Sequence, residues 1–288
     1  MNVAEQAPAA PLRGITLTSI GDLDTVLGLI ESSEEKLTVR LVIQSDVSMD
    51  SYRQAIEKLR PHAYIMVEIL DSHTWAEADI GELRSLTAEA VDALGDEVDV
   101  WEVGNELNGS WLGSSPEQIN AKASAVKEIV SQSGGRTAIT LNYWSHEGCY
   151  AQPWERLSTY ARSMPDDLRD VDYLFLSVYE MSCTPAQHPS ADDLAGALNS
   201  LGEIFPNARL GIGEISGYDP STPDSKTIDT EGRQAGNRRI ATYYYGLHDE
   251  LEAKVGTRYV GGYFWWHFRE DAVEGDMWPL LKELLEGL

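Results

Sequence analysis

Two glutamates interrupt segments that are otherwise apolar or small. Glu106 closes the run Val98–Glu106, and Glu214 lies within Ala208–Ile215. A charged side chain in an interior strand is rarely buried unless it is paired or functional. Two carboxyl groups about 5 Å apart can break a glycosidic bond by double displacement, in which one protonates the leaving oxygen and the other attacks the anomeric carbon. The two residues are therefore candidates for an acid/base and a nucleophile.

The elements that must position this pair are visible as β-rich runs alternating with amphipathic helical patterns. The expected strands are Gly14–Ile20, Leu37–Ser45, Ala63–Leu70, Val98–Glu106, Thr137–Trp144, Asp172–Tyr179, Ala208–Ile215 and Tyr259–His267. The expected helices are Leu23–Ser32, Ser51–Leu59, Ile80–Leu94, Pro116–Ser131, Trp154–Met164, Ala191–Ile204, Gly232–Leu251 and Trp278–Leu285.

Eight such units in 288 residues, or 36 residues per unit, predict a single α/β domain, a (β/α)₈ TIM barrel. A doubly wound open sheet is the competing architecture, but the first turn, Ser19-Ile20-Gly21-Asp22, lacks its glycine-rich fingerprint. We expect residues 1–12 to form a flexible leader and residues 13–288 to form the barrel. The irregular stretch Ser216–Asp229 is a candidate cleft wall or lid.

A barrel of this kind places its chemistry at the carboxyl ends of the strands. Glu106 and Glu214 are 108 residues apart, which is three units of 36. Strands three apart in an eight-strand ring lie about 135° around it, so side chains reaching inward would bring the carboxyls to roughly 5 Å. That separation favours a retaining over an inverting mechanism.

Aromatic and polar side chains gather at the same predicted strand ends. Aromatic faces suit the apolar faces of pyranose rings, while their polar edges stay hydrated. The sequence therefore predicts a sugar-binding rim. Its tryptophans are Trp75, Trp111, Trp144, Trp265 and Trp266, and its polar members include His73, Asn108, His146 and Tyr179.

The residues Asn105-Glu106 at the end of strand four, with Glu214 on strand seven, resemble the clan A glycoside hydrolases. This superfamily of barrels includes cellulase-like, mannanase-like and β-glucosidase-like enzymes. The resemblance implies that Glu106 is the acid/base and Glu214 the nucleophile. It also implies that Asn105 binds the substrate 2-hydroxyl and that Tyr179 hydrogen-bonds the nucleophile.

Other matches leave alternatives open. The family places a tryptophan of strand eight under the reacting sugar, for which Trp265 is favoured over Trp266. Arg40 matches an arginine of strand two in cellulase-like members, or it lies inside the barrel and pairs with Glu102. His73 resembles a substrate-site histidine of the same families.

Loop four and the histidines raise further questions. Asn108 and Trp111 either line subsites beyond the cleaved bond or shape the fourth loop. A metal-dependent barrel hydrolase is an alternative function, because His73, His146 and His267 follow or end predicted strands. A non-catalytic sugar-binding barrel is a second, since it needs the tryptophan rim but not both glutamates.

The composition of the chain disfavours some classes of binding partner. The chain has 47 acidic against 22 basic residues, a formal net charge of −25, which disfavours nucleic acid and anionic membranes. No apolar run reaches the roughly 18 residues of a membrane span, and MNVAEQAPAAPLRG lacks the apolar core of a signal peptide. We expect an oligo- or polysaccharide substrate, with endo-action on a β-linked polymer, and no cofactor.

The two cysteines bear on the compartment. Cys149 and Cys183 follow predicted strands five and six, so their loops are neighbours on one rim. This placement favours a disulfide over two free thiols, and a disulfide is typical of an oxidising, secreted or periplasmic location.

Overall fold

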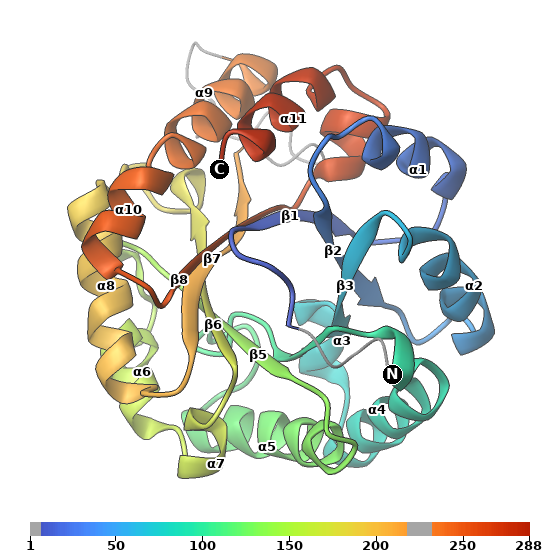
Figure 1. Cartoon of the computed structure of the whole chain (residues 1–288). Coiled ribbons are helices and arrows are strands. Elements are labelled where there is room, and N and C mark those ends of the chain that lie inside the picture. Colours follow the sequence, from blue (N-terminus) through green and yellow to red (C-terminus); the bar gives the residue numbers. More distant parts are fainter. Residues whose placement is uncertain (1–6, 218–231) are drawn as a thin grey trace.

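The computed structural model describes residues 7–217 and 232–288. Within these ranges, eight parallel strands pair in chain order from β1 to β8 and close into a barrel, with β8 beside β1. Figure 1 looks along the barrel, with the strands inside and the helices around them. The predicted single (β/α)₈ barrel is confirmed.

The strands keep close to their predicted positions and the helices lie between them. The strands are β1 Leu12–Leu17, β2 Leu37–Ile43, β3 Ala63–Ile69, β4 Val100–Gly104, β5 Thr137–Asn142, β6 Tyr173–Tyr179, β7 Arg209–Ser216 and β8 Tyr259–Trp265. The helices are α1 Leu23–Glu31, α2 Met49–Leu59, α3 Ser72–Glu77, α4 Ile80–Leu94, α5 Pro116–Gln132, α6 Leu157–Ser163, α7 Asp166–Arg169, α8 Ala191–Ile204, α9 Arg233–Tyr245, α10 His248–Val255 and α11 Trp278–Glu286.

Local capping explains where several of the helices begin. Asp79 and Glu82 form a reciprocal capping box at the start of α4, and Ser190 and Asp193 do the same for α8. Each box satisfies main-chain N–H groups that the first helical turn leaves without partners.

Two predicted helices differ from the structure. The predicted helix 154–164 starts only at Leu157, after a 3₁₀ turn at Pro153–Glu155. The predicted helix 232–251 divides into α9 and α10 around Gly246. Its buried positions continue at helical spacing across the break, so hydrophobic periodicity does not reveal the division. The helix α3 occupies a stretch that the sequence analysis left irregular.

The predicted leader and lid fall largely on residues that are not described. Residues 1–6 of the leader lie outside the described ranges, and its last residue, Leu12, already belongs to β1. Residues 218–229 of the proposed lid also lie outside them.

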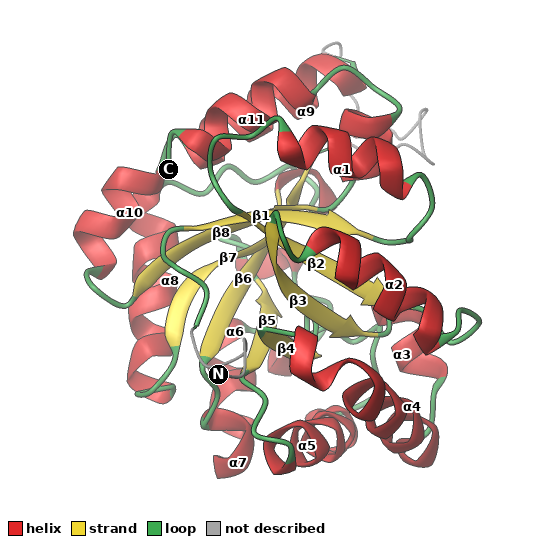
Figure 2. Cartoon of the chain, turned by 45° about the vertical axis from the view of Figure 1, so that its right-hand side comes forward, coloured by secondary structure: helices red, strands yellow, loops and turns green. Residues whose placement is uncertain are grey.

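The barrel interior is layered, which places polar groups beneath the functional rim. Its lower part is an apolar cluster that includes Met66, Val100 and Phe264. Because strand residues alternate between the two faces, the inward positions following Met66 and Val100 are Glu68 and Glu102, which are level in the β3–β4 register. A charged layer therefore lies directly above an apolar floor. The larger core lies between the strands and the helices. Figure 2 shows how the helices surround the strands.

Within the described ranges, no helix combines the length and the apolar character that crossing a bilayer requires.

Candidate active site

Glu214 is held by donors from three different strands. The side chain of Asn105, just beyond β4, donates to its Oε1 at 2.7 Å, and the hydroxyl of Tyr179, ending β6, donates to its Oε2 at 2.7 Å. Nη1 of Arg40, on β2, lies 2.8 Å from Oε1. The barrel thus brings together four predicted site residues, and the contacts orient the Glu214 carboxylate from both sides.

Glu106 lies in the same site but in different surroundings. It lies two residues beyond Gly104, the last residue of β4. Its φ of 50° is positive, which is uncommon for a residue with a side chain. Ser177, on β6, donates its hydroxyl to Oε1 of Glu106 at 2.7 Å. Burial, and secondly the charge of Glu214, raise the pKa of Glu106 to about 8. Glu106 is therefore mainly protonated at neutral pH and can give up a proton.

Arg40 forms the floor of the site. Its side chain is only 1% exposed, and it meets three carboxylates: Glu102 at 2.6 Å, Glu68 at 2.8 Å and Glu214 at 2.8 Å. The two possibilities left open for Arg40 are therefore combined, because it pairs with Glu102 inside the barrel and also contacts a site glutamate. Burial raises the pKa of Glu68 well above its ordinary range and also raises that of Glu102.

The preference for Trp265 over Trp266 is wrong. Trp265 is 0% exposed, packs in the core and donates its ring N–H to Asp271 at 2.9 Å. Trp266, its chain neighbour, faces the other side, where its half-buried ring lies 5.5 Å from the guanidinium carbon of Arg40. Adjacent strand residues point to opposite faces, so only one of the pair reaches the site. Trp75 is also buried in the core, which leaves a smaller aromatic rim than predicted.

Asn108 is a second correction. It is 1% exposed, and its amide group bonds to main-chain atoms of Asn142 and Glu155. Because these bonds occupy both ends of the amide, the structure supports the second of the two alternatives, in which Asn108 shapes loop four.

The three predicted histidines contact residues other than the two glutamates. His73 is on α3 with its side chain 83% exposed and 3.9 Å from Glu77. His146 is exposed and accepts a bond from the N–H of Gly148, while His267 pairs with Ser216. Among the described residues, no group of three or more His, Cys, Asp or Glu side chains is arranged to hold a metal ion.

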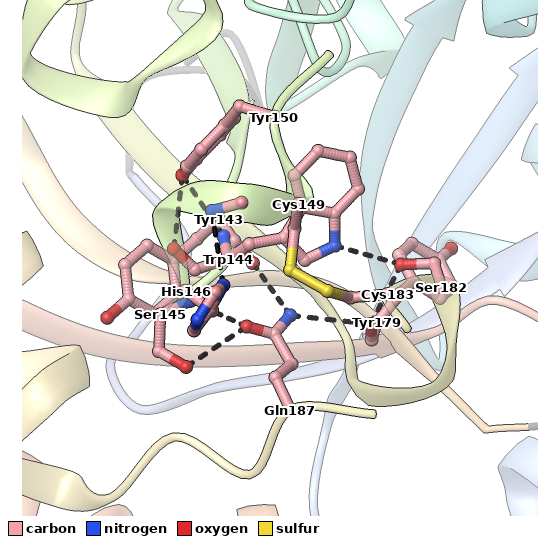
Figure 3. Close-up of a disulfide and its surroundings, with 11 residues drawn as sticks. Tyr143, Trp144, Ser145, His146, Cys149, Tyr150, Tyr179, Ser182, Cys183 and Gln187 are labelled. Carbon is pink, nitrogen blue, oxygen red and sulfur yellow. Dashed lines mark hydrogen bonds between the residues drawn. A yellow bond between two sulfur atoms is a disulfide. The ribbon is translucent and has the colours of Figure 1, made fainter. Parts of the chain in front are cut away.

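The outer rim contains the remaining predicted aromatics. Trp111 and Trp144 pack edge-to-face with their ring centroids 6.2 Å apart. The Cys149–Cys183 disulfide is formed beside them, with the two Cα atoms 5.4 Å apart, and it joins the loops after β5 and β6 (Figure 3). The favoured disulfide of the sequence analysis is confirmed.

Two further residues of the site, Ser177 and Glu68, follow the same sequence signals as the predicted ones. Ser177 is two positions before Tyr179 on β6, so strand alternation places both side chains on the same face. Glu68 interrupts an apolar strand in the same way as Glu106 and Glu214.

No description of a protein family matches the sequence, and no curated protein is similar to it in sequence. Solved structures are similar in fold. A broad-specificity endoglucanase from an uncultured bacterium has a TM-score of 0.59 at 13% identity, covering 99% of this chain and 89% of that one. A xylanase from Cellvibrio japonicus has 0.58 at 11%, covering 90% and 87%, and a β-mannanase from Thermomonospora fusca has 0.55 at 15%, covering 88% and 78%. The structures of these glycan-cleaving enzymes share the barrel fold of this chain, in agreement with the fold that the resemblance implies.

Proposed function

We propose that this protein is a retaining glycoside hydrolase that cleaves β-linked glycans, with Glu106 as acid/base and Glu214 as nucleophile. The observation that carries the proposal is one site holding two carboxyl groups in unlike surroundings. Donors from Asn105 and Tyr179 orient Glu214. Glu106 has a pKa of about 8 and retains its proton at neutral pH. An acid and a nucleophile of this kind are what double displacement requires.

In the first step, Glu106 transfers its proton to the glycosidic oxygen as the bond between that oxygen and the anomeric carbon breaks. The carboxylate of Glu214 forms a new bond to the same carbon from the opposite face. The leaving sugar departs with the proton, and Glu106 becomes a carboxylate.

In the second step, the Glu106 carboxylate takes a proton from water. The water oxygen bonds to the anomeric carbon, and the bond to Glu214 breaks. Two inversions retain the original configuration, and the sum of both steps consumes one water molecule.

Two neighbouring groups suit a sugar between the glutamates. The amide of Asn105 donates to Oε1 of Glu214, which places it beside the 2-hydroxyl of a sugar bonded to Glu214. Trp266 offers an aromatic face beside Arg40 for the apolar side of a pyranose.

The substrate class we propose is a β-linked polysaccharide attacked internally. The aromatic residues of loops four and five extend the site beyond one sugar, and the similar structures include an endoglucanase, a xylanase and a mannanase. The disulfide supports a secreted or periplasmic location.

The test is reducing-end release from mixed-linkage β-glucan, xyloglucan, xylan and β-mannan, with the product anomer followed by NMR. We expect the wild-type protein to release the β-anomer first from at least one polymer. Removing the acid/base with Glu106→Ala should lower kcat/KM by about 10²- to 10⁴-fold, and Glu214→Gln should abolish turnover.

Sodium azide provides a control that separates catalysis from folding. The substrate for this control is a 2,4-dinitrophenyl β-glycoside, whose leaving group departs without protonation, so Glu106→Ala still forms the glycosyl-enzyme. Azide occupies the space that the substitution opens and attacks this intermediate without general-base assistance, so it should restore turnover and yield a β-glycosyl azide. A Glu214→Gln variant with an unchanged rate would remove Glu214 from the mechanism, and release of the α-anomer first would exclude retention.

A further inference from the structure

Trp111 and Trp144 form an aromatic pair immediately beyond Glu106. Trp111 is 43% exposed. The N–H of Gly109 donates to the carbonyl of Glu106 at 2.8 Å, which keeps loop four tight against the end of β4. The indole of Trp111 lies over Gly109, where a Cβ would come within 2.2 Å of the ring. The absence of a side chain at Gly109 thus lets an exposed aromatic ring lie close to the proposed acid/base.

Trp144 is held from two sides by residues of two different loops. Its main-chain N–H donates to the hydroxyl of Tyr150 at 3.1 Å, and the two rings pack edge-to-face with centroids 5.1 Å apart. Its ring N–H donates to the hydroxyl of Ser182 at 3.0 Å, and Ser182 in turn donates to the carbonyl of Tyr179 at 2.8 Å. Trp144 is therefore connected through Ser182 to the main chain of a residue that binds Glu214.

The disulfide joins these two supports. Tyr150 directly follows Cys149, and Ser182 directly precedes Cys183. Figure 3 shows the bond between the two loops, with the ring nitrogen of Trp144 pointing toward Ser182. The cross-link thus limits the separation of the two groups that fix the indole.

We propose that Trp111 and Trp144 bind a sugar ring on the leaving-group side of the cleaved bond, and that the Cys149–Cys183 disulfide positions Trp144 for that role. The assignment rests on the proposed function, because the proton donor defines this side. Glu106 must contact the bridging oxygen, and the leaving sugar is attached to that oxygen.

The location and chemistry of the pair agree with a neutral ring as the ligand. The loops after β4 and β5 carry the pair, whereas Trp266 follows β8, which lies four strands from β4 and therefore directly across the closed ring of eight. An exposed indole offers its face to pyranose C–H groups, and the formal charge of −25 disfavours an anionic ligand here.

The experiment compares two substrates on the same variants. One is the polymer of the four named above that the wild-type enzyme cleaves best. The other is the 2,4-dinitrophenyl β-disaccharide of the same sugars, which carries no sugar on the leaving-group side. For Trp111→Ala and Trp144→Ala we expect kcat/KM on the polymer to fall at least about tenfold further than on the aryl glycoside, mainly through KM.

The disulfide is tested with the Cys149→Ala/Cys183→Ala double variant, which should show the same selective loss. If that variant does not fold, Ser182→Ala removes the indole's hydrogen-bond partner while the disulfide stays intact, and it should also weaken the polymer selectively. Tyr64→Ala is the matched control. This half-buried aromatic residue lies near the amino end of β3, whereas the site lies at the carboxyl ends of the strands, so the ratio of the kcat/KM values for the two substrates should not change.

The outcomes separate this inference from the function on which it rests. A wild-type enzyme that cleaves none of the polymers or aryl glycosides contradicts the proposed function itself. If the enzyme is active but Trp144→Ala lowers kcat/KM equally for the polymer and the aryl glycoside, the proposed sugar site is overturned and the proposed function is not. A selective loss in Trp144→Ala without one in the disulfide variant or in Ser182→Ala overturns the positioning role.

Discussion

Glu106 and Glu214 have the same side chain and differ in what surrounds them. Glu214 has an ionic partner in Arg40 and two hydrogen-bond donors. Within the described part of the chain, Glu106 has one hydrogen-bond donor, the hydroxyl of Ser177. It lies close enough to Glu214 for that negative charge to disfavour the ionisation of Glu106. The proposed roles of acid and nucleophile therefore depend on neighbours that come from several strands.

At the scale of this residue pair, Ser177→Ala should shift the alkaline limb of the pH–rate profile to higher pH. The hydroxyl of Ser177 stabilises the charged form of Glu106 and so lowers its pKa, while burial and Glu214 raise it to about 8. Removing the hydroxyl raises the pKa further, and the protonated acid persists to higher pH. The measurement is kcat/KM for a polysaccharide between pH 5 and 10.

Ser163→Ala is a control, because the hydroxyl of that serine donates to the carbonyl of Tyr160 on α6 and not to either glutamate. Its profile should match that of the wild type. An alkaline limb that moves to lower pH in Ser177→Ala would contradict the role assigned to this hydroxyl.

Two neighbouring residues at the end of β8 have different surroundings: Trp265 packs in the core, and Trp266 lies beside the proposed site. Trp265 points into the layer between strands and helices, and Trp266 points toward Arg40. Farther around the ring, beyond β1, strands β2, β3 and β4 place Arg40, Glu68 and Glu102 in contact. Strand alternation and register produce both arrangements.

Matched substitutions on β8 test this division. Trp265→Ala should lower the free energy of unfolding by about 3–5 kcal/mol, because it leaves a cavity in the core. Trp266→Ala should mainly reduce kcat/KM, with a smaller loss of stability because its ring is only half-buried. Urea denaturation and kinetics on the same two proteins measure both effects, and equal stability losses would contradict the assignment.

For the molecule as a whole, the excess of acidic residues should limit which polymers the proposed enzyme can bind. A protein with a formal charge of −25 repels anionic chains at long range, and salt screens that repulsion. We therefore expect KM for carboxymethylated glucan to exceed KM for the neutral glucan in low salt, and the ratio to fall as sodium chloride rises to about 0.5 M. A ratio that is independent of salt would show that the net charge has no part in substrate choice.

Much of the fold was predictable because it depends on local periodicity. Alternating strand and helix patterns every 36 residues leave few architectures other than a barrel. The isolated charges of Glu106 and Glu214 in apolar strands marked the site, and the loop positions of the two cysteines pointed to their disulfide. The break between α9 and α10 escaped prediction, because the apolar spacing continues across it.

The contacts between side chains of different strands depend on how the barrel closes. The sequence by itself placed Arg40 on a strand and left two interpretations, and the closed barrel satisfied both by surrounding one guanidinium with carboxylates from β3, β4 and β7. The closed barrel also buries Trp265 in the core, places Trp266 beside Arg40, and directs the side chain of Asn108 toward main-chain atoms. The physical reason is that a one-residue step along a strand reverses the direction of a side chain, while local composition barely changes.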